Sequence, residues 1–69
     1  MSLGAKRATM VEVRENSSFA GWFEVIFNGQ LVEEVQGRRK ALRIAKEVAK
    51  KNKVKHIVSQ GKIIEVDDL

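Results

Sequence analysis

Hydrophobic and polar residues alternate in several short segments of this chain, and a period of two is typical of half-buried β-strands. The first such segment is 9–15, and the turn formers Asn16, Ser17 and Ser18 end it. Aromatic and β-branched residues then fill 21–27, directly before Asn28-Gly29. Because Asn-Gly readily adopts positive φ at both centres of a type I′ turn, we expect 21–27 and 30–35 to form a hairpin.

A two-residue turn also predicts the register of this hairpin. The expected cross-strand pairs are Phe27 with Gln30, Ile26 with Leu31, Val25 with Val32, Glu24 with Glu33, and Trp22 with Val35. Both faces of the hairpin are then apolar. We interpret one face as a candidate oligomer interface, because an exposed apolar patch that contains Trp is unusual on a monomer. Its residues are Trp22, Ile26, Leu31 and Val35. Two alternatives stay open: other segments of the chain cover this face, or Trp22 stacks on a nucleobase.

Residues 38–51 contain no Gly or Pro, and their apolar positions fall on one arc at about 100° per residue, which predicts an amphipathic helix. Gly37 is the expected N-cap and Asn52 the expected end.

A second hairpin is expected from 54–58 and 62–66 around Gln60-Gly61, with His56 opposite Glu65. The order β-β-β-α-β-β predicts an α+β fold, in which one antiparallel-rich sheet carries the single helix on one face.

The length of 69 residues allows one domain, residues 1–69, in which 1–7 are expected to be a disordered tail or a cloning remnant. The chain has no Cys and one His, so neither disulfides nor a metal can reinforce this small core, which favours a homo-oligomer. No long apolar run or leader pattern is present, so we expect no membrane contact and a cytoplasmic location.

Positive charge is concentrated in residues 36–56, which hold nine Lys and Arg residues against one carboxylate, Glu47. On a helical wheel Arg39, Arg43, Lys46 and Lys50 fall within about 60° of each other, opposite the apolar arc. Cations in the first helical turn oppose the helix dipole, so a bound phosphate would be favourable there. The predicted nucleic-acid-binding residues are Arg38, Arg39, Arg43, Lys46 and Lys50. The alternatives are a solubilising surface or a complement to the protein's own acidic strands.

No constellation for catalysis stands out in this sequence. His56 opposite Glu65 is interpreted as a cross-strand ion pair, and zinc would need three or four converging ligands. We therefore predict no enzymatic activity, no metal or other cofactor, and no small-molecule substrate.

Two resemblances attach to these residues. The aromatic strand with Phe23-Glu24-Val25, the Ala-spaced helix and the Gly hairpin, within residues 10–66, resemble a family of small bacterial α+β domains of unknown function. Residues 22–49, with Arg38-Arg39-Lys40-Ala41 opening the helix, are similar to the last half of a double-stranded RNA-binding domain. That resemblance implies that Arg38 and Arg39 contact phosphates across the major groove.

Two functional hypotheses follow. The first is a non-enzymatic module that contacts a nucleic-acid phosphate backbone weakly, and without sequence specificity, through its basic helix face. The alternative is a protein-interaction or homo-oligomerisation module with no nucleic-acid role.

Overall fold

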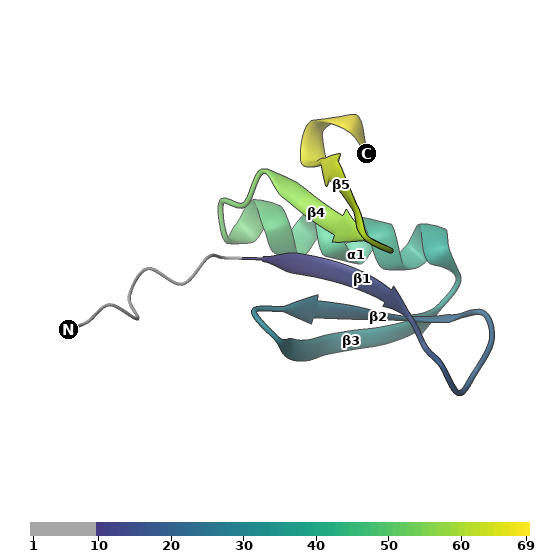
Figure 1. Ribbon diagram of the computed structural model, residues 1–69. Coiled ribbons are helices and arrows are strands. Elements are labelled where there is room, and N and C mark those ends of the chain that lie inside the picture. The colour runs from purple at the N-terminus through teal and green to yellow at the C-terminus, as the bar shows by residue number, and fades with distance from the viewer. Residues whose placement is uncertain (1–9) are drawn as a thin grey trace.

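The computed structural model describes residues 10–69, so the tail expected at 1–7 lies outside the described residues. One helix and five strands follow one another in the predicted order, and the α+β class is confirmed (Figure 1). The elements are β1 Val11–Glu15, β2 Trp22–Phe27, β3 Gln30–Gln36, α1 Arg38–Lys51, β4 His56–Ser59, β5 Lys62–Glu65 and a 3-10 helix, η2, Val66–Asp68. The predicted helix limits agree with α1, and the strand limits differ by one or two residues.

The five strands form a single sheet in the order β3-β2-β1-β4-β5. Three neighbouring pairs are antiparallel, and β1 with β4 is parallel, so the sheet is mixed and antiparallel-rich. The parallel pair arises because α1 carries the chain from the edge strand β3 across one face of the sheet, so that the next strand, β4, lies beside β1. Figure 1 shows α1 behind the sheet. No helix or strand of residues 10–69 lies over the opposite face, which we call the open face.

Both hairpins turn through two residues with positive φ, as a type I′ turn requires. Asn28 and Gly29 have φ values of 51° and 84°, and Gln60 and Gly61 have 51° and 81°. The Asn28 side chain also accepts the backbone N–H of Met10 at 2.8 Å, which ties this turn to the start of β1. The predicted turns are therefore confirmed.

The register predicted for the first hairpin is wrong beyond its second pair. Ile26 pairs with Leu31 as expected, but Val25 pairs with Glu33, so Val32 is the extra residue of a β-bulge. Each later residue of β3 is thereby moved to the other face of the sheet. The observed pairs are Glu24 with Glu34, Phe23 with Val35, and Trp22 with Gln36. The bulge is favourable because it directs Val35 toward α1, where it packs against the core.

The core lies between α1 and the covered face of the sheet. Three helix residues, Ala41, Ala45 and Ala49, have no exposed surface. They pack with the buried valines of β1 and β2 and with Ile57 of β4. A stripe of Ala lets the helix approach the sheet closely, because no longer side chain holds the two layers apart. The inward direction of this stripe leaves the cationic arc of α1 on the outside.

Candidate nucleic-acid interface

The start of α1 is built from backbone rather than from a capping side chain. Gly37 is the N-cap, with φ 101° and ψ 130°, and no side chain caps the first turn. The N–H of Gly37 donates to the carbonyl of Gly21 at 2.8 Å, which attaches the helix start to the loop between β1 and β2. The first turn contains no acidic residue, so the positive end of the helix dipole meets only the cations of residues 38–40.

Four of the five predicted nucleic-acid-binding side chains, those of Arg38, Arg39, Arg43 and Lys50, are exposed. Lys46 differs, because it is half-buried and its Nζ donates to the carbonyl oxygen of Leu69 at 2.9 Å. Part of its hydrogen-bonding capacity is therefore used within the chain.

The outer face of α1 holds two adjoining open hollows. Arg43 and Lys46 line both of them. Lys50 and the carboxylate residue Glu47 also line one, and Arg39, Leu42 and Leu69 also line the other. The structure thus brings Arg39, Arg43, Lys46 and Lys50 together, as the helical wheel predicted. Arg38 lines neither hollow and lies at the helix start.

Charge pairing leaves this surface positive. The one ion pair within residues 10–69 joins Arg14 Nη2 to Glu12 Oε1 at 3.1 Å, and both residues belong to β1. Within the same range, no cation of α1 lies at ion-pair distance from an Asp or Glu side chain. Docking of the helix face on this chain's own acidic strands is therefore not observed within the described part of the chain.

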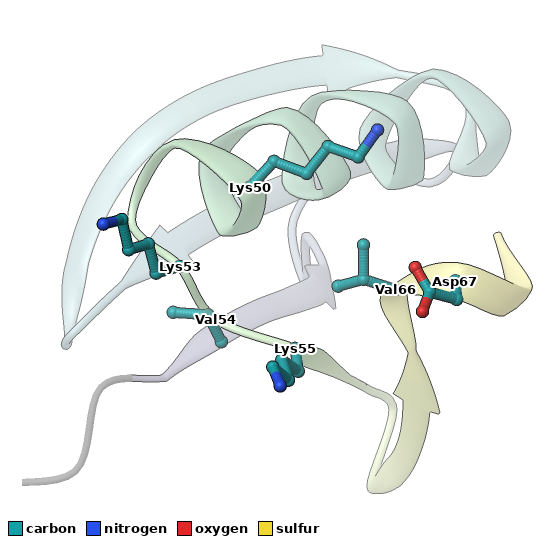
Figure 2. Close-up of a pocket in the computed structure, with 6 residues that line it drawn as sticks. All are labelled: Lys50, Lys53, Val54, Lys55, Val66 and Asp67. Atoms are coloured by element: carbon teal, nitrogen blue, oxygen red, sulfur yellow. The ribbon is translucent and has the colours of Figure 1, made fainter.

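The basic surface continues past the end of α1. A hollow there is lined by Lys50, Lys53, Val54, Lys55, Val66 and Asp67. Figure 2 shows Val54 in the segment after α1 and Val66 at the start of η2, whereas the amino groups of Lys53 and Lys55 point away from these two valines. These lysines extend the positive field, and Asp67 is the carboxylate among the lining residues.

The predicted oligomer interface is only partly brought together. Trp22 and Ile26 lie on the open face, because along β2 they alternate with the core residues Phe23 and Val25. Leu31 lies on the same face, because it is the cross-strand partner of Ile26. Val35 does not, since the bulge places it on the covered face, where it packs on the core. Strands β1, β4 and β5 add further residues to the open face, which the sequence did not predict to lie beside this patch. One cross-strand row runs Leu31, Ile26, Glu12, Val58 and Ile63 over all five strands.

Phe19 is a surface residue that the sequence reasoning missed. Its side chain is 65% exposed, and it lines an open hollow with Trp22 and Glu34. An aromatic residue inside a polar turn, after Asn16-Ser17-Ser18, was the signal that could have identified it. A single exposed apolar side chain is common on a protein surface, but Phe19 lies beside a second exposed aromatic residue, Trp22.

His56 and Glu65 are cross-strand neighbours, as predicted. The expected ion pair between them does not form, since no nitrogen of His56 lies within 4.0 Å of a carboxylate in the range 10–69. No group of three or more His, Cys, Asp or Glu residues in that range could hold a metal ion. Within it, moreover, no helix has the length and apolar character needed to cross a membrane.

Comparison of the chain with protein-family models, with curated proteins and with solved structures gives no match.

Proposed function

We propose that this protein is a non-enzymatic module that binds nucleic acid through the phosphate backbone, using the cations on the outer face of α1. The observation that carries the proposal is that Arg38, Arg39, Arg43 and Lys50 are exposed and have no carboxylate partner in the described residues. Unpaired cations on one face attract the regularly spaced charges of a phosphate backbone, and their binding releases counterions.

Such binding would be weak and would discriminate little between sequences. Phosphate contacts position a protein on nucleic acid but carry no direct sequence information. A cytoplasmic location agrees with the Cys-free sequence.

The test is fluorescence anisotropy with a labelled DNA duplex at about 50 mM salt, where electrostatic binding is easiest to detect. The double variant Arg39→Gln with Arg43→Gln removes two charges from the helix face. A matched control, Arg14→Gln with Lys62→Gln, removes two charges from the sheet strands β1 and β5. Because both variants lose two positive charges and so have the same net charge, a difference in their affinity reports the position of the charges.

We expect the helix variant to bind about a hundredfold more weakly than the wild type at this salt, since two phosphate contacts are lost. The control should lose far less. No binding by the wild type, or an equal loss in both variants, would contradict the proposal. Circular dichroism should show an unchanged helix, because both arginines point away from the core.

Self-association is a second candidate, and the uncovered sheet face favours it. Leu31 and Ile63 are 59% and 71% exposed at opposite edges of that face. Ile26, in the same row, is only 8% exposed, so the apolar surface that a second copy would remove from water belongs mainly to Leu31 and Ile63. Light scattering at micromolar concentration is the measurement. A mass of 7.8 kDa, that of one chain, would exclude this candidate.

A further inference from the structure

Two exposed aromatic side chains gather at one end of the sheet. Phe19 is 65% exposed and Trp22 is 38% exposed, and both line one open hollow. Neither belongs to the core cluster or to the side chains packed against it. Both side chains therefore reach solvent outside the core, and they are available for contact with a ligand.

The loop that carries Phe19 is held in place before any ligand arrives. The side-chain oxygen of Asn16 accepts the backbone N–H groups of Ser18 at 2.7 Å and Phe19 at 3.0 Å. The carbonyl of Phe19 accepts the N–H of Trp22 at 3.2 Å, and the N–H of Asn16 donates to the carbonyl of Trp22 at 2.8 Å. A ring on such a preorganised loop loses less entropy on binding than a ring on a mobile one.

Positive charge lies at this same end of the molecule. Trp22 pairs with Gln36, and Arg38 follows Gln36 by two residues, a separation of at most about 7 Å along the chain. Figure 1 shows the β1–β2 loop and the start of α1 at one end of the fold. The exposed Arg38 and Arg39 thus follow, by two and three residues, the cross-strand partner of Trp22.

Carboxylates near Trp22 make the open face less positive than the helix side of this surface. Glu24 and Glu34 are paired on the open face next to Trp22, and the Asn16 amide donates to both, to Glu24 at 3.5 Å. Arg14, the other cross-strand neighbour of Glu24, is paired with Glu12, so the two glutamates leave the open face beside Trp22 less favourable for phosphate. Arg38 and Arg39 have no carboxylate partner in the described residues and attract phosphate toward the helix side. A polymer that carries phosphates along one edge and flat bases along the other satisfies both conditions.

We infer that Phe19 and Trp22 form a base-stacking platform for single-stranded nucleic acid, whose phosphates lie against Arg38 and Arg39. This inference rests on the proposed function and adds the class of strand to it. In a duplex the bases are stacked on one another and offer no free face to these rings, whereas unpaired bases do.

Trp22 is the only tryptophan of the chain, so its fluorescence reports on the platform in the unmodified protein. The probes are a short oligothymidylate, the same strand without bases (an abasic deoxyribose phosphate chain), and a duplex of equal length. We expect the oligothymidylate to quench Trp22 at saturation, and neither the abasic strand nor the duplex to do so. We also expect the oligothymidylate to bind about tenfold more tightly than the abasic strand.

The variant test compares Phe19→Ala with Ile63→Ala, which removes a similarly exposed apolar side chain from β5. Phe19→Ala should weaken binding of the oligothymidylate about tenfold and leave the abasic strand unaffected. Ile63→Ala should change neither. Because the Phe19 ring packs on no core residue, the variant keeps its fold, and circular dichroism verifies this.

The outcomes separate this inference from the proposed function. If the abasic strand binds as tightly as the oligothymidylate and Trp22 stays unquenched, the platform is refuted and phosphate binding stands. An equal effect of Phe19→Ala and Ile63→Ala refutes the platform as well. If none of the three probes binds at about 50 mM salt, both the platform and the proposed function are wrong.

Discussion

The salt dependence of the proposed nucleic-acid binding follows from how many of the five predicted cations are free to contact phosphate. Four of the five predicted contacts project freely from the helix, and Lys46 is held by the Leu69 carbonyl. If the four free cations each neutralise one phosphate, log affinity should fall against log salt with a slope of about −3.6 on B-DNA and about −2.8 on single strands. Between 50 and 200 mM salt the affinity for duplex should therefore fall about 150-fold.

Single substitutions test which cations contribute. Arg43→Gln should reduce the steepness of the duplex slope by about 0.9, because one phosphate contact is lost. Lys46→Gln should reduce it by clearly less, since its amino group already serves Leu69. The assay is fluorescence anisotropy at four or more salt concentrations for each variant.

Two results would refute this reasoning. A slope near zero would mean that binding does not depend on phosphate contacts. An equal change in slope for Arg43→Gln and Lys46→Gln would mean that the hydrogen bond to Leu69 does not restrain Lys46.

Three further predictions concern stability and can be measured by thermal unfolding. Ser59 is 1% exposed and its hydroxyl has no hydrogen-bond partner in the described structure, so Ser59→Ala should stabilise the fold by about 1 kcal/mol, or about 7 °C; a lower melting temperature would show that the hydroxyl is satisfied. Ile57 has no exposed surface, so Ile57→Val should cost about 1 kcal/mol through the methyl group lost from the core, and an unchanged melting temperature would contradict its place there. Gly37→Ala should lower the free energy of unfolding by about 1–3 kcal/mol, because φ at this position is 101°, a value that residues with a Cβ rarely adopt. The added Cβ would meet no atom within 4 Å, so the cost comes from the backbone conformation. An unaffected stability would mean that the helix start relaxes freely.

Local features of the sequence were sufficient to determine the limits of α1 and both hairpin turns. The helix is set by apolar spacing within 38–51, and it ends where Gly37 and Asn52 interrupt it. The turns at Asn28-Gly29 and Gln60-Gly61 depend on φ preferences of two residues each. The outward direction of Arg39, Arg43 and Lys50 follows from the same period, since the Ala stripe has to face the sheet.

The register of β2 with β3 could not be read from the sequence. Both faces of that hairpin are apolar, so alternation alone does not specify which set turns inward. Packing of Val35 with Phe23 against the core, through the bulge at Val32, decided it. The interface predicted from Trp22, Ile26, Leu31 and Val35 was divided between two faces for this reason.

The remaining decisions required contacts between residues distant along the chain. The parallel pairing of β1 with β4 joins segments separated by β2, β3 and α1, and no local pattern encodes it. Pairing of β1 with β2 closes the loop between them and places Phe19 beside Trp22. The same loop provides Gly21, whose carbonyl accepts the N–H of Gly37. The sequence by itself thus determined the elements and the charge of the helix face. Tertiary packing alone decided which side chains of different elements lie together, because long-range pairing depends on the burial of the whole core rather than on local preference.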